Sequence, residues 1–258
     1  RLTNSLFRRT TWSSLGAQGN QARTAQMGLE KLSFGGFQAR LNATPYLMLV
    51  SPHVVARPAD WPANHRVTGF LFDDDTTWPP PQELADFLAA GDKPVYIGFG
   101  SMSDKDAERT TRVVIDGVQQ SGQRAVLLSG WAGIGAAGVP NCIHLLKYAP
   151  HSWLFPRMAA VVHHGGAGTT AAGLRAGIPS IITPVGADQP FWGKRVYELG
   201  VGPKPVARAK LTAETLAAAL RRAVTDGGMH ERAAALGQKI EAEDSAGEAL
   251  AAVRESLG

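Results

Sequence analysis

Residues 159–184, AAVVHHGGAGTTAAGLRAGIPSIITP, are the stretch that decides the expected fold of this chain. An apolar, β-branched run ends in two histidines, and three glycines follow within four residues. The segment 167–176 is bounded by Gly177 and Pro179, as is typical of a short helix, and a second apolar run, PSIITP, comes after it. Strand, glycine turn, helix and strand in this order indicate one unit of a parallel sheet.

The same alternation of strands and helices extends over the chain from about residue 82 onward. The expected strands are apolar throughout, which indicates that both faces of their sheet are covered; they are PVYIGFG (94–100), RAVLLSG (124–130), CIHLL (142–146), AAVVHH (159–164) and PSIITP (179–184). The expected helices are 82–91, 104–122, 167–176, 189–200, 212–225, 230–243 and 245–257. The sequence therefore predicts an α/β fold, a Rossmann-like parallel sheet with helices on both faces.

The part of the chain before this region has a different character. Residues 1–45 are typical of helix and loop and do not resemble a domain of their own; a strand candidate, YLMLV, follows at 46–50. Six prolines in residues 51–81 disfavour both helix and central strand and indicate a connector between two units. Within it, the acidic triplet Asp73–Asp75 resembles a carboxylate metal site but is more typical of a solvated loop.

The composition is that of a globular protein with a sizeable core, because 44% of the 258 residues are hydrophobic and 19% are charged. The net charge is +4, and we expect this excess not to be gathered in one block, which disfavours a nucleic-acid partner. The single cysteine, Cys142, excludes an intrachain disulfide, and no apolar run approaches the roughly 20 residues that span a bilayer. We expect a cytoplasmic protein, with peripheral membrane contact left open. The chain begins with arginine and no signal-peptide pattern, so we expect that its natural beginning is missing.

The glycine turn has the features of a diphosphate cradle. Gly165, Gly166 and Gly168 have no Cβ, so their backbone N–H groups can approach an anion closely. The helix that follows offers unsatisfied N–H groups and partial positive charge at its N-terminus, and Thr169 and Thr170 add hydroxyls. These features together predict a site for a phosphate-containing ligand.

Three other interpretations of this turn stay open at this point. The pattern G-x-G-x-x-A at 166–171 is also that of a dinucleotide site, with Asp188 near the spacing of a ribose-binding acid. His163 and His164 are candidates for a metal site, although adjacent residues at a strand end point to opposite faces. The third interpretation is a close-packed turn in which the histidine has no chemical role.

The turn after the next strand favours one of these interpretations. Asp188 and Gln189 place a carboxylate and an amide side by side, and such a pair can bind the vicinal hydroxyls of a sugar. A diphosphate-binding backbone beside hydroxyl-binding side chains indicates a nucleotide-sugar site. The structural alternative for the pair is N-capping of the following helix, which is compatible with sugar binding.

Three segments carry a resemblance to a known family: SPHVVARPADWPANHRVTGF (51–70), IGFGSM (97–102) and the run from YAPHSW to GPKPV (148–206). They resemble bacterial sterol 3-β-glucosyltransferases, which belong to the UDP-sugar-dependent transferases with the GT-B fold. The resemblance is strong over about residues 40–205 and looser in the last helices. It implies three parts: 1–50, the tail of an N-terminal acceptor domain; 51–81, an interdomain connector; and 82–258, the C-terminal nucleotide-sugar-binding domain.

The resemblance also implies roles for individual residues. The residues that match contacts to the donor diphosphate are Ser101, His163, Gly165, Gly166, Gly168 and Thr169. Tyr148 and His151 stand where plant members place a tryptophan and a glutamine around the base, and Trp131 is a further candidate for base contact. Asp188 and Gln189 match the pair that holds the sugar hydroxyls. Ala171 stands where the plant motif has a glutamate for the ribose, so the choice between uridine and thymidine donors is less secure.

The implied activity is inverting transfer of glucose from UDP-glucose to the 3-hydroxyl of a sterol or similar hydrophobic alcohol, without a metal or other cofactor. The general base of the family lies in the N-terminal domain, and residues 1–45 contain no histidine, aspartate or cysteine and only one carboxylate, Glu30. We therefore expect this chain to bind a UDP-sugar but to be inactive alone. The alternatives are an antibiotic or polyketide glycosyltransferase that uses another nucleotide sugar, and a nucleotide-binding module that lacks transfer chemistry or works only with a partner chain.

Overall fold

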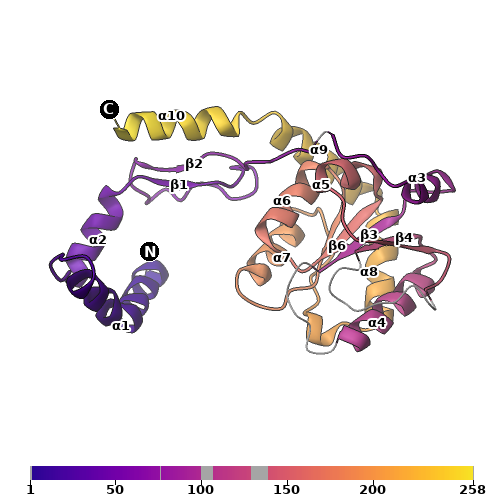
Figure 1. The fold of residues 1–258 in the computed structure, drawn as a ribbon, viewed down its shortest axis with the longest axis horizontal. Coiled ribbons are helices and arrows are strands. Elements are labelled where there is room, and N and C mark those ends of the chain that lie inside the picture. Colours follow the sequence, from indigo (N-terminus) through magenta and orange to yellow (C-terminus); the bar gives the residue numbers. More distant parts are fainter. Residues whose placement is uncertain (1, 76, 100–106, 129–138, 258) are drawn as a thin grey trace.

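The computed structural model describes residues 2–75, 77–99, 107–128 and 139–257. They form a rounded α/β body and an extended arm, which contains the N-terminal helices at the left of Figure 1. The body is built on one five-stranded sheet, and all its strand pairs are parallel. The predicted fold class is therefore confirmed.

The order of the strands locates the edge at which ligands bind in folds of this kind. The strands are β3 (Val95–Gly98), β4 (Ala125–Leu128), β5 (Ile143–Leu146), β6 (Ala160–His163) and β7 (Ser180–Ile182). Their spatial order is β5-β4-β3-β6-β7, so the chain builds outward from β3 to β5 and then returns to place β6 on the other side of β3. Ligands of open α/β sheets bind outside the carboxyl ends of the strands at such a reversal.

Helices cover both faces of this sheet. Val95 and Ile97 of β3 point into one buried cluster, whereas Tyr96 between them points into another on the opposite face. The first face is covered by α4 (Ala107–Ser121) and α8 (Ala213–Thr225), and the second by α3 (Gln82–Ala89) and the short α5 (His151–Leu154). The helices α6 (Ala167–Arg175), α7 (Gln189–Glu198) and α9 (Gly227–Glu241) share a third buried cluster with β7. Of these helices, α5 was not predicted.

The arm contains the first elements of the chain and contacts the last one. It consists of α1 (Leu2–Ala25), α2 (Phe34–Ala43) and a two-stranded parallel sheet of β1 (Tyr46–Met48) and β2 (His65–Val67). The C-terminal helix α10 (Ser245–Leu257) runs along these strands in Figure 1, and its Glu255 forms an ion pair with Arg66 of β2. The prolines of 51–81 had disfavoured a central strand there, but β2 falls between Pro62 and Pro79 and pairs with a single neighbour.

The positive charge of the chain is concentrated on this arm. Residues 1–45 contain six lysines and arginines and one acidic residue, so they carry a net charge of +5, and the other 213 residues carry −1. The expectation that the excess is not gathered in one block was therefore wrong. An anion that binds the body must be attracted by local groups, because the body has no overall positive charge.

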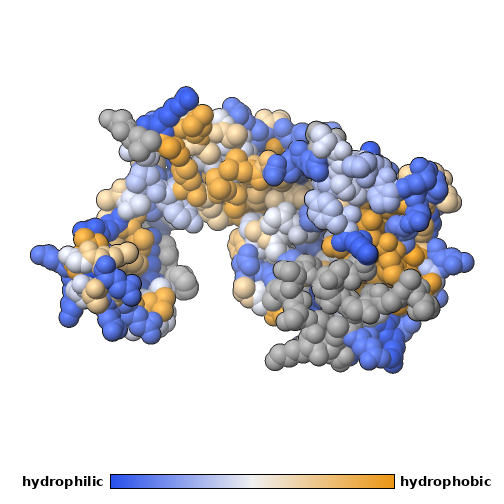
Figure 2. All heavy atoms as spheres, viewed as in Figure 1, coloured by the Kyte–Doolittle hydropathy of each residue, from blue (hydrophilic) through white to orange (hydrophobic). Residues whose placement is uncertain are grey.

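The surface view in Figure 2 shows apolar residues gathered between the rounded body and α10. Exposed apolar side chains of the chain include Leu49, Leu71 and Leu250, each about half exposed. Among the described residues, no helix is both long enough and apolar enough to cross a membrane.

Candidate functional site

The predicted glycine turn lies at the reversal of strand order. β6 ends at His163, which pairs in register with Gly98 at the end of β3, and α6 begins four residues later with Gly166 at its N-cap position. The turn is thus placed at the carboxyl edge of the two central strands by the topology of the sheet.

The local geometry requires a glycine at position 165 and leaves little room for a side chain at position 166, where the His164 ring would have to move. Gly165 has a φ of +93°, and a Cβ there would lie 2.7 Å from Ile182 Cγ2 and 3.2 Å from the Gln189 carbonyl oxygen. A Cβ at Gly166 would lie 2.5 Å from His164 Nε2. Gly168 differs, because a Cβ there would meet nothing within 4 Å and would point into open space. The turn therefore packs tightly against the 188–189 loop and opens at the start of α6.

The N-terminus of α6 has donors to offer to a ligand. No side chain caps it, and the first N–H groups of a helix have no acceptor within the helix. Ala167 and Gly168 are exposed and Thr169 is half-buried. Thr170, by contrast, is buried and donates its hydroxyl to the Gly166 carbonyl oxygen at 2.9 Å, so the expectation that it adds a hydroxyl to the cradle was wrong. This end of α6 can bind an anion through backbone N–H groups and the helix dipole.

His163 is fully buried, and its hydrogen bond fixes its tautomer. The Gly165 N–H donates to Nδ1 at 3.1 Å, so the proton of the neutral ring sits on Nε2. Nε2 has no hydrogen-bond partner among the described residues. Burial, together with the nearby imidazoles of His164 and His151, lowers the pKa of His163 to about 3. His163 therefore offers a neutral N–H donor rather than a positive charge.

Two further residues lie near this turn: His164, which the sequence analysis considered only as a metal ligand, and Arg208, which it did not consider. His164 is half-buried; burial and the Arg208 guanidinium lower its pKa, while the Asp188 carboxylate raises it. Arg208, in the 3-10 turn Arg208–Lys210, is buried, lies 3.3 Å over the Phe99 ring and donates to Thr183 Oγ1 at 3.1 Å. A cation thus lies close to the turn, which only the fold reveals, since 45 residues separate Arg208 from His163.

Asp188 and Gln189 are adjacent in sequence but have different environments. Asp188 is exposed, and its Oδ2 accepts a hydrogen bond from Trp192 Nε1 at 2.8 Å. Gln189 is 4% exposed, and its Oε1 accepts hydrogen bonds from the backbone N–H groups of Val185 at 2.7 Å and Gly186 at 3.3 Å. Asp188 holds the N-cap position of α7, but its side chain does not cap the helix. The capping alternative for its carboxylate was therefore wrong.

The two residues predicted near the base, Tyr148 and His151, lie shortly after β5 and at the start of α5. Tyr148 is 62% exposed and packs edge-on against Trp78, with ring centroids 6.5 Å apart. His151 is stacked on Phe155, with ring centroids 4.3 Å apart, and burial lowers its pKa. The other two predicted contacts, Ser101 and Trp131, lie outside the residues that the structure describes.

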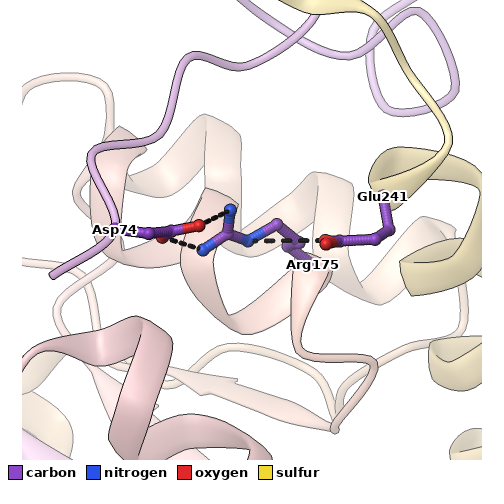
Figure 3. A network of polar contacts seen from close by, with 3 residues as sticks. All are labelled: Asp74, Arg175 and Glu241. Atoms are coloured by element: carbon purple, nitrogen blue, oxygen red, sulfur yellow. Dashed lines mark hydrogen bonds and ion pairs between the residues drawn. The ribbon is translucent and has the colours of Figure 1, made fainter. Parts of the chain in front are cut away.

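His151 also lines a cavity of about 710 Å³, together with residues of α5, α6 and α9 and with Asp74 and Asp75. Figure 3 shows the ion-pair network beside it, in which Arg175 lies between Asp74 and Glu241. The Arg175 guanidinium donates two hydrogen bonds to the Asp74 carboxylate and lies 3.8 Å over the Phe72 ring. The hydrogen bond from Arg175 is also the main cause that lowers the pKa of Asp74. Residues 73–75 are exposed and belong to no helix or strand, which confirms the interpretation as a solvated loop, and Asp74 is in addition paired with Arg175.

The metal interpretation of the two histidines has no support in the geometry. Their ring centroids are 6.4 Å apart, and the ring planes are nearly perpendicular. Within the described ranges, no group of three or more histidines, cysteines, aspartates or glutamates could hold a metal ion.

Comparison with protein families relates this fold to known proteins. The model of the erythromycin biosynthesis protein CIII-like C-terminal domain matches residues 123–255. Sterol 3-beta-glucosyltransferase UGT80A2 of Arabidopsis thaliana is 42% identical over 209 residues, which cover 80% of this chain and 33% of that protein. The sterol 3-beta-glucosyltransferase of Saccharomyces cerevisiae is 39% identical over 269 residues, covering 99% of this chain and 22% of that protein. The chain thus spans a third or less of these relatives.

Solved structures show the same fold at low sequence identity. A glycotransferase of kitacinnamycin superposes with a TM-score of 0.73 at 20% identity, over 96% of this chain and 66% of that chain. The glycosyltransferase SnogD of Streptomyces nogalater superposes with a TM-score of 0.62 at 24% identity, over 80% of this chain and 56% of that chain. The α/β body has the fold of the C-terminal, Rossmann-like half of a GT-B protein.

Proposed function

We propose that this chain, which belongs to the family of erythromycin biosynthesis protein CIII-like C-terminal domains, is the donor-binding half of an inverting glucosyltransferase. The proposed reaction is transfer of glucose from UDP-glucose to the 3-hydroxyl of a sterol or similar hydrophobic alcohol; two relatives are named sterol 3-beta-glucosyltransferases. The observation that carries the proposal is the uncapped N-terminus of α6, which lies at the reversal of strand order near an exposed carboxylate, Asp188.

The diphosphate of the donor binds at this helix end in our proposal. The N–H groups of the first turn and the Thr169 hydroxyl donate to phosphate oxygens, and His163 Nε2–H adds a donor from below the turn. Because burial keeps His163 neutral, it stabilises the leaving UDP by hydrogen bonding and does not protonate it. We propose Ser101 as a further phosphate contact. No metal is needed in this scheme, since fixed donors and the α6 dipole supply the stabilisation.

The sugar and base are held on opposite sides of the diphosphate. Asp188 accepts hydrogen bonds from sugar hydroxyls, because its side chain is exposed and Oδ1 has no hydrogen-bond partner among the described residues. We retain Gln189 as the second residue of the proposed sugar-binding pair; its oxygen accepts hydrogen bonds from the loop that precedes Asp188. The exposed ring of Tyr148 stacks on the base, with His151 and Trp131 as further proposed contacts.

The remaining parts of the reaction lie outside the donor site. We propose that 1–50 belong to an acceptor domain, that 51–81 connect it to the donor domain 82–258, and that the general base lies outside this chain. Deprotonation of the acceptor hydroxyl is required for transfer, so the chain alone should bind the donor and turn over little. An apolar acceptor also brings the enzyme into peripheral contact with membranes.

A second acceptor class is favoured by the names of the family and of the superposed structures. These names refer to erythromycin, kitacinnamycin and a glycosyltransferase of a Streptomyces species, and they make a polyketide or related natural product the alternative acceptor. The donor half cannot separate the two acceptors, because the proposed donor contacts are the same in both.

Calorimetric titration of this chain tests the donor half directly. We expect binding of UDP and UDP-glucose, with weaker binding of UDP-galactose, dTDP-glucose and NAD. Asp188→Ala should weaken binding of UDP-glucose far more than binding of UDP, because only the sugar contact is lost. Equal losses for both ligands would remove the assigned sugar contact, and preference for NAD would replace the proposal with a dinucleotide site. Steady transfer to a sterol by the chain alone would contradict the absence of its base.

A further inference from the structure

The Asp188 carboxylate does not do what its position in the helix predicts. An aspartate at an N-cap normally accepts a hydrogen bond from the second or third N–H of the helix. Here no such bond forms, and Oδ2 instead accepts from the indole N–H of Trp192, one turn along α7, at 2.8 Å. The Asp188 carboxylate is therefore oriented by the Trp192 indole N–H and not by the backbone N–H groups at the start of the helix.

Trp192 is itself held rigidly. It is 5% exposed and belongs to the same buried cluster as Ala171 and Leu174 of α6 and Ile182 of β7. The neighbouring Phe191 packs edge-on against it, with ring centroids 5.2 Å apart. The indole N–H therefore has a fixed position relative to α6, the helix whose N-terminus forms the diphosphate cradle.

The loop before Asp188 is held in an unusual conformation. Ala187 has a φ of +53°, the one positive φ of a non-glycine residue among those described. Such a conformation persists where surrounding contacts impose it. On one side of Ala187, the Gln189 oxygen accepts hydrogen bonds from the N–H groups of Val185 and Gly186. On the other side, Trp192 donates a hydrogen bond to Asp188.

We propose that Trp192 is a positioning residue that fixes the Asp188 carboxylate for recognition of the donor sugar, an inference that rests on the proposed function of this site. The indole N–H occupies Oδ2, so Oδ1 is presented to vicinal hydroxyls of a hexose. An exposed aspartate without this anchor samples several rotamers, and ordering it on binding lowers affinity. A fixed acceptor also distinguishes sugars that differ in the orientation of one hydroxyl.

The test compares Trp192→Phe with the parent chain by calorimetric titration with UDP, UDP-glucose and UDP-galactose. The substitution removes the N–H and keeps an aromatic ring in the core. We expect about tenfold weaker binding of UDP-glucose, as for loss of a hydrogen bond to a charged group, and unchanged binding of UDP. The preference for UDP-glucose over UDP-galactose should fall by a similar factor. Trp12→Phe, in α1 and far along the chain, is the matched control and should change none of these values.

Two further measurements separate this inference from the proposed function. If Trp192 acts through Asp188, the double variant Trp192→Phe/Asp188→Ala should bind UDP-glucose no more weakly than Asp188→Ala alone. In the parent chain, the indole N–H resonance of Trp192 should shift on addition of UDP-glucose and stay in place with UDP, a readout that needs no variant. A selective effect of Asp188→Ala with none from Trp192→Phe would overturn the positioning role and leave the donor site standing. No selective effect of Asp188→Ala would remove the sugar contact itself.

Discussion

The two ends of α6 are built in opposite ways. At the N-terminus, no side chain caps the helix, Gly168 faces open space and a buried histidine keeps one donor without a partner among the described residues. At the C-terminus, Arg175 is 15% exposed and bound by two carboxylates from elements distant in sequence, Asp74 and Glu241. Folding satisfies polar groups wherever it can, so the end left unsatisfied is the one that a ligand completes.

The two ends of α6 also differ in role: the N-terminal end binds the ligand in our proposal, and the C-terminal end anchors Asp74. The cradle end is positioned by steric constraints, with Gly165 pressed against Ile182 and Gln189. The C-terminal end of α6 is positioned by the charge of Arg175, which holds Asp74 on the body. Changes at the first end should therefore alter donor affinity, and changes at the second should alter stability without touching the donor.

Gly165→Ala should have the largest effect of the substitutions at these two ends. The new Cβ would lie 2.7 Å from Ile182 Cγ2 at a backbone φ of +93°, so the turn must move. Strain of this kind costs about 1–3 kcal/mol, and displacement of the N–H groups should weaken UDP binding by roughly a hundredfold. Calorimetry with UDP and thermal unfolding measure the two effects.

Gly168→Ala is the matched control for that substitution. Nothing lies within 4 Å of its Cβ, and alanine is favoured over glycine within a helix. Stability should stay the same or rise slightly, because the new methyl group meets no protein atom. The control concerns stability alone, since Gly168 is itself a proposed phosphate contact. Similar losses of stability for both variants would show that the turn tolerates no side chain anywhere and that the steric account of Gly165 is wrong.

The two ends of α6 should lose stability over different pH ranges, and His163 sets the range for the N-terminal end. Its folded pKa of about 3 is below the ordinary 6.5, so the unfolded chain binds the proton first as pH falls. The stability from burying the neutral ring is complete above about pH 6.5 and is lost progressively toward pH 3. Between pH 7 and pH 5 the parent should lose about 2 kcal/mol more than His163→Gln. Urea unfolding across this range measures the difference, and identical slopes would contradict the buried neutral state.

Arg175→Met should have a smaller effect, confined to stability. It leaves the buried stem of the side chain in place and removes the hydrogen bonds to Asp74 and the ion pair with Glu241. We expect a loss of about 1–2 kcal/mol in urea unfolding, because the guanidinium is mostly buried although its partners are partly exposed. UDP affinity should not change, and a marked loss of UDP binding would show that the two ends are coupled.

The exposed pair of Arg112 and Glu108 in α4 is the control for that change. Both side chains are more than two-thirds exposed, and Arg112 Nη2 lies 3.1 Å from Glu108 Oε1. Arg112→Met should therefore change stability by less than about 0.5 kcal/mol.

The sequence was sufficient for those features that depend on local pattern. Continuous apolar runs predicted the five strands of the sheet, and the glycines at 165 and 166 predicted a tight turn after β6. Parallel strands place the residues that follow them at one edge, so the neighbourhood of this turn and the 188–189 loop followed from the fold class alone.

Other features could not be predicted from local pattern, because they depend on distant elements, on competition for one side chain or on a helix too short to show periodicity. Arg208 meets Phe99 and Thr183 only after β3 and β7 are aligned in the sheet. The N-cap rule failed at Asp188 because a buried indole competes for its carboxylate. The short helix α5 was missed because its four residues lie between Pro150 and Pro156, where no helical periodicity can develop.

The smallest expected effect on stability is that of protonating Asp74, the partner of Arg175, at low pH. The pKa of Asp74 lies below its ordinary 3.8, mainly because Arg175 donates hydrogen bonds to the carboxylate, so the folded state holds this group ionised at lower pH than the unfolded chain does. Its contribution is present above about pH 4 and is lost as pH falls below that value. The stability difference between the parent and Asp74→Asn should thus be constant from pH 5 to 8 and shrink toward pH 3. A difference that already changes between pH 5 and pH 6.5, the window of His163, would show that the two ends of α6 do not titrate independently.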